Sequence, residues 1–163
     1  MAIEIREAVT GDIPTLLELL KQIASLHHRG RPDFFADGGS KYDRRQLAAI
    51  LKDRTRPVFV AEEKESGAVL GYAFCLLMQN EGDSVLLPVR RLYLDDLCVA
   101  EQARGRGVGK LLIRQVKECA RRLDCAVLDL NVWAFNRNAI GFYEANGFTP
   151  QRLYYEWKPD SED

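Results

Sequence analysis

Apolar residues recur along the chain with two periods, and these periods predict its strands and helices. A period of two, or a short apolar run rich in β-branched and aromatic residues, predicts strands. Segments of this kind cover residues 3–8, 57–63, 68–78, 92–100, 125–133 and 148–157. A spacing of three and four residues predicts amphipathic helices. Segments with that spacing cover residues 10–28, 43–54, 108–123 and 136–146.

The order of these segments predicts a single α/β (α+β) domain over residues 1–163. A strand, a long helix and a second strand follow one another from residue 92 to residue 133, which is the order of a βαβ unit. The segments at 57–63 and 68–78 are joined by a short polar turn and predict a hairpin. We therefore expect a sheet with both parallel and antiparallel neighbours.

The composition places the chain among soluble globular proteins. It is 47% hydrophobic and 29% charged, with a formal net charge of −1 and a pI of about 6.2. Because there is no basic surplus to neutralise phosphates, nucleic acid is not expected as a partner. No stretch approaches the apolar length of a membrane span, and the N-terminus lacks the apolar region of a signal peptide, so we expect a cytoplasmic protein.

The four cysteines predict neither a metal site nor a catalytic thiol. They form no C-x-x-C pair, and the two histidines lie far from them in the sequence. Each lies in an apolar segment, where a cysteine is usually a small core residue. These residues are Cys75, Cys98, Cys119 and Cys125.

Three glycines stand directly before the third predicted helix, in the stretch ARGRGVGKLL (residues 103–112). The free N–H groups of a helix N-terminus bind anions, and glycine lets a phosphate approach the backbone. The register excludes two common phosphate loops. A P-loop would need glycine at Arg104 and Ser or Thr at Leu111. The dinucleotide motif G-x-G-x-x-G would need glycine at Lys110 or Leu112.

The remaining pattern, R-x-x-G-x-G over residues 104–109, resembles the acetyl-CoA-binding motif of the GNAT superfamily of N-acetyltransferases. Downstream, NRNAIGFYEANGF (residues 136–148) resembles that family's N-x-x-A-x-x-F-Y-x-x-x-G-F signature. The resemblance implies an acetyl-CoA-binding core over about residues 92–148. It also implies a mixed central sheet of about six to seven strands with flanking helices, in which the strands at 92–100 and 125–133 splay apart.

The resemblance further implies that acetyl-CoA is the co-substrate and that the backbone amides of the glycine turn hold its pyrophosphate. These amides belong to Arg104, Gly105, Arg106, Gly107, Val108, Gly109 and Lys110. The two arginines add positive charge near the phosphates. Leu97, Cys98 and Val99 on the splayed strand line the pantetheine arm, with the backbone of Leu97 and Val99 pairing with it. Asn136 contacts the pantetheine region, and Tyr143 is the general acid for the departing thiolate.

The general base is less clearly marked in the sequence. An alkyl amine must lose a proton before it attacks a thioester, and a carboxylate can accept that proton. Where some family members carry a glutamate, this chain has Asn131, which cannot act as a base. Asp95 and Asp96 are the alternatives, with Asp96 slightly favoured, and a base acting through water remains open. Because side chains alternate along a strand, we expect at most one of the two to face the acceptor.

We expect the acceptor, a primary amine of a small molecule or a peptide, to be recognised by the segments at residues 26–42 and 79–91. Phe34, Phe35 and Tyr42 offer apolar walls there. No metal is expected to take part.

Two other functions fit the same motifs. A non-catalytic CoA-binding or sensing module is favoured by Asn131, which stands where a carboxylate is expected. A transferase of a longer acyl group would need a wider pocket for the thioester. The aromatic residues of the segment at 148–157 also favour a homodimer.

Overall fold

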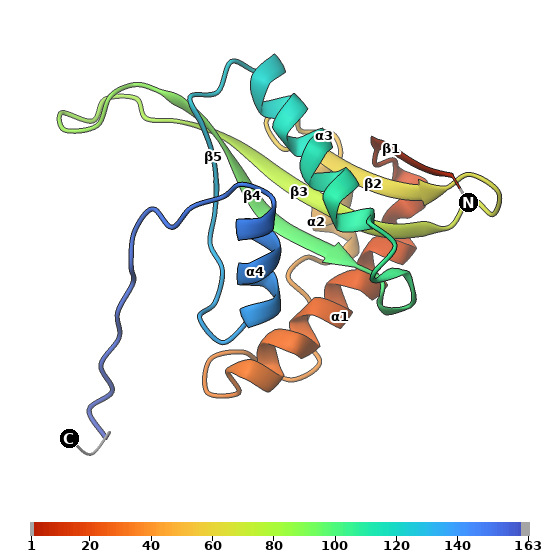
Figure 1. Cartoon of the computed structure of the whole chain (residues 1–163), viewed down its shortest axis with the longest axis horizontal. Coiled ribbons are helices and arrows are strands. Elements are labelled where there is room, and N and C mark those ends of the chain that lie inside the picture. The colour runs from red at the N-terminus through yellow and green to blue at the C-terminus, as the bar shows by residue number, and fades with distance from the viewer. Residues whose placement is uncertain (1, 161–163) are drawn as a thin grey trace. The chain divides into compact units, whose positions relative to one another are not determined.

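The computed structural model describes residues 2–160, which contain a five-stranded sheet (Figure 1). The strands are β1 (Ile3–Glu7), β2 (Val58–Glu63), β3 (Val69–Gln79), β4 (Arg90–Val99) and β5 (Val127–Leu130). They lie in the order β1-β2-β3-β4-β5, with antiparallel neighbours from β1 to β4 and a parallel β4–β5 pair. The helices are α1 (Ile13–Gly30), α2 (Arg44–Ile50), α3 (Val108–Arg122) and α4 (Arg137–Ala145), with 3₁₀ turns η1 (Thr10–Asp12) and η2 (Glu101–Ala103).

The chain divides into two compact units, the first ending at Asn131 and the second beginning at Val132. The sheet, α1, α2 and α3 belong to the first unit, and α4 belongs to the second. Within residues 2–160, none of the helices has the length and apolar character needed to cross a membrane.

Helices cover both faces of the sheet in the first unit. In Figure 1, α3 lies across one face, and α1 and α2 lie on the other. The apolar side of α3 buries Leu112 and Val116, and that of α1 buries Leu16 and Leu20. Because helices cover it on both sides, β3 is a nearly continuous apolar run rather than an alternating one.

The sequence predicts a strand over residues 148–157, and this prediction is wrong, because the segment has no regular secondary structure. Its aromatic residues favour an extended chain, but a strand forms only where backbone groups pair with those of a neighbour. The sheet therefore has five strands rather than six to seven. The strand expected over residues 125–133 is also shorter, because only Val127–Leu130 pairs with β4.

The cysteines are core residues, as the sequence predicts. Cys75, Cys98 and Cys119 are buried, Cys125 is half-buried, and all four are free thiols. Burial raises the pKa of the Cys98 thiol to about 12. That thiol therefore stays protonated at neutral pH and donates a hydrogen bond to the Leu19 carbonyl on α1 at 3.6 Å.

Gly71 on β3 lies close to the neighbouring strand β4 and to Val108 at the start of α3. A Cβ at this position would lie 2.7 Å from the Cys98 carbonyl oxygen and 3.3 Å from Val108 Cγ1. We expect Gly71→Ala to lower the free energy of unfolding by about 1–3 kcal/mol, the usual cost of overpacking a core. Urea unfolding measures this change. The control is Gly11→Ala, where a Cβ would have no neighbour within 4 Å. Equal free energies of unfolding in the two variants would contradict the close approach at Gly71.

Candidate active site

β4 and β5 pair over only part of their length. Pairing runs from Arg91 opposite Val127 to Leu94 opposite Leu130. β4 then continues to Val99 with β3 as its strand neighbour. Beyond Leu94, the edge of β4 that faced β5 has no strand partner among the described residues. The predicted separation of these strands is confirmed, and an extended ligand can pair with such an edge as an added strand would.

The backbone groups of Leu97 and Val99 point toward this unpaired edge. The amide of Ala100 donates to the carbonyl of Leu70, next to β3, at 2.8 Å. Because backbone groups alternate between the two edges of a strand, those of Leu97 and Val99 point away from β3. The Val99 carbonyl accepts a hydrogen bond from Gln22 Nε2 on α1 at 3.0 Å. Helix α1 thus fixes the end of the unpaired edge, a contact that no sequence motif indicates.

A β-bulge lies at the point where β4 and β5 part. Asp96 pairs with Phe74 and Leu94 pairs with Cys75, so Asp95 is an extra residue without a partner on β3. An inserted residue of this kind interrupts the alternation of side chains between the two faces of a strand.

The bulge brings the carboxylates of Asp95 and Asp96 to the same face of the sheet. The Tyr42 hydroxyl donates to Asp95, and the Tyr72 hydroxyl donates to Asp96. Both tyrosine rings contact Phe74, with centroid distances of 5.7 Å for Tyr42 and 4.8 Å for Tyr72. The bulge thus interrupts the alternation from which we expected at most one carboxylate to face the acceptor, and the choice between Asp95 and Asp96 stays a prediction.

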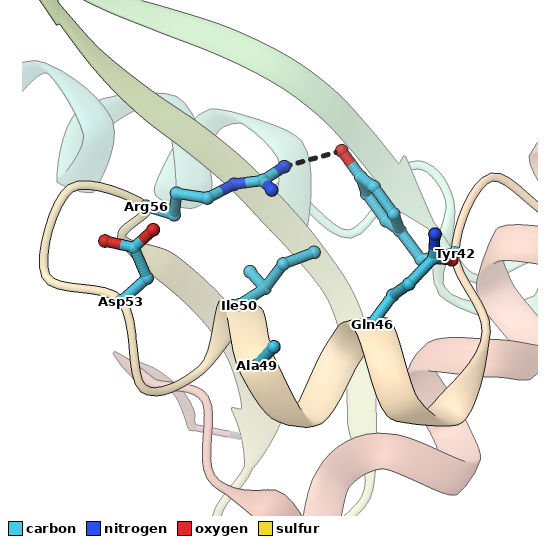
Figure 2. Close-up of a pocket in the computed structure, with 6 residues that line it drawn as sticks. All are labelled: Tyr42, Gln46, Ala49, Ile50, Asp53 and Arg56. Atoms are coloured by element: carbon cyan, nitrogen blue, oxygen red, sulfur yellow. Dashed lines mark hydrogen bonds between the residues drawn. The ribbon is translucent and has the colours of Figure 1, made fainter.

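Both oxygens of the Asp95 carboxylate are held by donors. The Tyr42 hydroxyl donates to Oδ2 at 2.5 Å, and Lys41 Nζ donates to Oδ1 at 2.9 Å. Arg56 Nη2 donates in turn to the Tyr42 oxygen at 2.8 Å, as Figure 2 shows. Burial and the hydrogen bond to Asp95 raise the pKa of Tyr42 to about 12, so its hydroxyl stays a donor at neutral pH. Asp95 is therefore suited to be a fixed negative charge rather than a proton acceptor.

The carboxylate of Asp96 is suited to accept a proton. Asp96 is partly buried, and one oxygen accepts a hydrogen bond from the Tyr72 hydroxyl at 3.1 Å. Desolvation raises the pKa of Asp96 to about 6, and the charge of Asp95 adds to this, while Lys41 and the Tyr72 hydrogen bond oppose it. A carboxylate with a pKa near neutrality is matched to general base catalysis at physiological pH.

A cavity of about 210 Å³ lies beside Tyr42 and Arg56. Figure 2 shows these two side chains meeting above Ile50. The remaining lining residues come from α2 and the turn after it, and they are Gln46, Ala49 and Asp53. Ligand pockets usually measure about 300–1,000 Å³, so this cavity is small for a whole acceptor. The cavity adjoins the residues that hold Asp95, but its size does not mark it as the acceptor site.

Of the predicted acceptor walls, Tyr42 reaches Asp95 directly. Phe35 stacks on His27 with a centroid distance of 5.0 Å. Burial and, to a smaller extent, the positive charge of Lys41 lower the pKa of His27. Phe34 packs edge-on against Phe35 but is itself 65% exposed. The loop before β4 ends in an exposed apolar tip that includes Val85 and Leu87.

The glycine turn has the backbone of an anion site. Gly105 and Gly107 have φ values of +75° and +78°, and a Cβ on either would meet no atom within 4 Å. Gly107 is the N-cap of α3, and no side chain caps the helix there. The first N–H groups of α3 therefore lack an acceptor within the helix and can bind an anion. Val108, by contrast, is buried and anchors the start of the helix in the core.

The two arginines of the turn differ in their surroundings. Arg106 forms an ion pair with Glu63 on β2, with Nη2 and Oε1 2.7 Å apart. Arg104 is exposed. Part of the positive charge expected beside the phosphates is thus engaged by a carboxylate.

The second unit contains the other motif. The Asn136 side chain caps α4 by accepting a hydrogen bond from the Ala139 amide at 3.1 Å. The Tyr143 ring packs edge-on against Phe142 and Phe148, with centroid distances of 5.3 Å and 5.6 Å. Both residues therefore have structural roles within this unit, and a role in ligand contact is compatible with them.

Asn131 cannot act as a base. Its side-chain amide donates a hydrogen bond to the Tyr93 hydroxyl at 2.9 Å. Within residues 2–160, no cluster of three or more His, Cys, Asp or Glu side chains is placed to hold a metal ion.

Comparison with known proteins identifies the fold and the family. The model of the acetyltransferase (GNAT) family matches residues 20–148. The thialysine N-epsilon-acetyltransferase of Bos taurus is 28% identical over 153 residues, covering 88% of this chain and 82% of that protein. The L-ornithine N5-acetyltransferase of Arabidopsis thaliana is 30% identical over 108 residues, covering 66% of this chain and 44% of that protein.

A crystal structure of a mutant BH1408 protein from Bacillus halodurans has the same fold. It superposes with a TM-score of 0.90 at 24% identity and covers 95% of this chain and 98% of that one. The family model spans most of the chain and includes both the glycine turn and the segment of Asn136 and Tyr143. The chain belongs to the GNAT family of acetyltransferases, and it is an N-acetyltransferase.

Proposed function

We propose that this protein transfers an acetyl group from acetyl-CoA directly to a primary alkyl amine of a small molecule, such as a diamino acid or a polyamine. The observation that carries the proposal is the carboxylate pair at the bulge, where Asp95 is held as a charge and Asp96 has a pKa of about 6. The relatives named as acting on thialysine and ornithine support an acceptor of this class. A peptide amine is the other acceptor compatible with the site.

The proposed chemistry assigns different tasks to the two carboxylates. An alkyl ammonium has a pKa of about 10.4, so deprotonation at pH 7 costs about 4–5 kcal/mol, at about 1.4 kcal/mol per pKa unit. Asp95 attracts the ammonium as a fixed negative charge. Asp96 accepts its proton as the amine attacks, in the role of general base. No protein nucleophile is needed, because amine and thioester react directly.

Residues of the first unit fit two parts of acetyl-CoA, its pyrophosphate and its extended arm. The open left-handed turn at Gly105 and Gly107 fits a pyrophosphate, and the unpaired edge of β4 fits an extended amide-containing arm. Acetyl-CoA supplies the activated acetyl thioester. We assign the turn amides from Arg104 to Lys110 to the pyrophosphate and the backbone of Leu97 and Val99 to the arm.

In the second unit, we assign Asn136 to contact with the arm and Tyr143 to protonation of the departing thiolate. Tyrosine has an ordinary pKa of about 10, close enough to that of a thiol, about 8.5, to donate this proton. These two assignments follow from the match to the family signature.

The proposal predicts a definite pH profile. If ionised Asp96 takes the proton of an ammonium substrate, kcat/KM should rise with a slope of about one up to pH about 6 and then level off. The reason is that the Asp96 carboxylate is mostly ionised above that pH, while the amine stays mostly protonated up to its own pKa of about 10. If the amine instead loses its proton to bulk water before binding, kcat/KM should keep rising toward the amine pKa of about 10. Initial rates between pH 5 and 9 distinguish the two profiles.

The acceptor class is tested by a panel of amines with release of the CoA thiol as the readout. Diamino acids and polyamines should be turned over, and monoamines or a lysine-containing peptide more slowly. Binding of CoA without thiol release for any amine would favour a non-catalytic CoA-binding module. Turnover only with succinyl-CoA or longer acyl-CoAs would favour transfer of a longer acyl group.

We also propose that the protein is a cytoplasmic homodimer. The free cysteines fit a reducing compartment. Side chains of the segment at 148–157 are largely exposed, Tyr154 by 99% and Trp157 by 74%. Exposed apolar surface of this kind usually marks an interface. The proposed partner is a second copy, because β5 is an edge strand of the sheet to which an extended segment can add.

The homodimer predicts a mass of two chains in light scattering at micromolar concentration. Tyr154→Lys combined with Trp157→Lys should shift the protein to a monomer, because two charges cannot be buried in an apolar interface. The matched control is Val85→Lys with Leu87→Lys, which adds the same charges at the exposed loop tip. A wild-type protein that is monomeric in this assay would contradict the proposal.

A further inference from the structure

A lysine of the chain itself lies against Asp95, where the proposed function places the acceptor ammonium. Lys41 Nζ lies 2.9 Å from Asp95 Oδ1 and 3.0 Å from the Asp95 carbonyl oxygen. Asp95 is the bulge residue, immediately after the last β4–β5 pair at Leu94 and Leu130. The ammonium therefore lies at the start of the unpaired edge of β4, where the two strands part.

This position is fixed by the residues that follow Lys41. The Tyr42 ring packs against Phe74, and its hydroxyl is bonded to Asp95. Asp43 caps α2, where its Oδ1 accepts a hydrogen bond from the Gln46 amide at 2.8 Å. The loop between α1 and α2 is thus tied down directly after Lys41. The Lys41 side chain nevertheless remains 41% exposed, so its amine is not enclosed by the protein.

The chemical class of this amine is the class proposed for the acceptor, a primary amine at the end of an aliphatic chain. We propose that Lys41 is an internal acetyl acceptor, so that the enzyme acetylates its own Lys41 when acetyl-CoA is present and no competing amine is. This inference rests on the proposed function, because the same carboxylates and thioester would serve both acceptors.

The reaction balances without any further reactant. Lys41 Nζ loses a proton to Asp96, the proposed general base, and forms a bond to the acetyl carbonyl carbon. The bond between that carbon and the CoA sulfur breaks, and the departing thiolate takes up one proton. The products are acetylated Lys41 and CoA. Because the amide formed is uncharged, the ion pair with Asp95 is lost, and Asp95 becomes open to an external ammonium.

The test is peptide mass spectrometry of the purified protein after timed incubation with acetyl-CoA alone. Lys41 should gain an acetyl group at least about tenfold faster than the exposed Lys52 on the same chain, since Lys41 is held beside the reacting groups. In urea-unfolded protein, the two lysines should react at similar rates. Adding ornithine or spermidine should slow acetylation of Lys41 and leave that of Lys52 unchanged. The matched variant Lys41→Arg keeps a positive charge for the ion pair and should leave this peptide unmodified.

Two results would overturn the inference. The first is acetylation of Lys41 at the rate of Lys52 or more slowly in the folded protein. The second is a Lys41 rate that does not respond to the competing amine. If thiol release with the amine panel is normal while Lys41 stays unmodified, only the inference on Lys41 fails. If neither reaction occurs although CoA binds, the proposed function fails with it.

Discussion

Replacing Asp96 by asparagine should lower the kcat of amine acetylation by about 100- to 10,000-fold, the usual contribution of a positioned general base. Asparagine is close in size to aspartate and can still accept the hydrogen bond from the Tyr72 hydroxyl, but it cannot take up a proton. The KM for acetyl-CoA should change little, because the Asp96 side chain is not among the assigned cofactor contacts. Steady-state rates with a diamine at saturating acetyl-CoA measure the effect.

The adjacent carboxylate provides the matched control. Asp95→Asn removes a charge at a site where Lys41 and Tyr42 already hold both oxygens. This variant should mainly raise the KM for the amine and lower kcat far less than Asp96→Asn does. The assignment of the base is wrong if the order is reversed, with Asp95→Asn nearly inactive and Asp96→Asn close to wild type in kcat.

Substituting alanine at both Gly105 and Gly107 should weaken CoA binding by about 10- to 100-fold. Both residues have left-handed backbone, which costs an alanine about 1–2 kcal/mol each. A factor of ten in affinity corresponds to about 1.4 kcal/mol, so partial relaxation of the turn is enough to produce this loss. Isothermal titration calorimetry with CoA measures the affinity directly.

The control is a glycine distant in sequence from the turn that has the same backbone conformation. It distinguishes the effect of backbone strain on stability from a loss of CoA binding. Gly67, in the turn between β2 and β3, has a φ of +70°, and a Cβ there would have no neighbour within 4 Å. Gly67→Ala should lower the free energy of unfolding to a similar extent per residue and leave the affinity for CoA unchanged. Equal affinities for CoA in the double variant and in Gly67→Ala would show that the glycine turn is not part of the CoA-binding site.

The features that could be predicted from sequence are local ones. The glycine turn and the start of α3 are specified by residues that follow one another directly, and the register of Gly105 and Gly107 already excluded the other phosphate loops. The separation of β4 from β5 followed from the family resemblance. The pairing confirms it, since it ends at Leu94 while β4 continues to Val99.

The features that could not be predicted depend on contacts between distant segments. The bulge at Asp95 arises from the register between β3 and β4, and nothing in the adjacent pair of aspartates marks it. The contacts of Lys41 and Arg56 with the site require α2 to be packed on the sheet. The strand expected over residues 148–157 failed for a related reason, because propensity alone provides no neighbour to pair with.

The central claim is transfer of acetyl from acetyl-CoA to a primary alkyl amine, and its most direct test follows both products of one reaction. The protein is incubated with isotopically labelled acetyl-CoA and the best amine of the panel, and released thiol and labelled N-acetyl product are quantified together. We predict that they appear in equal amounts and that both rates fall together in Asp96→Asn. Thiol released without labelled amide, or product formation unaffected by Asp96→Asn, would contradict the account.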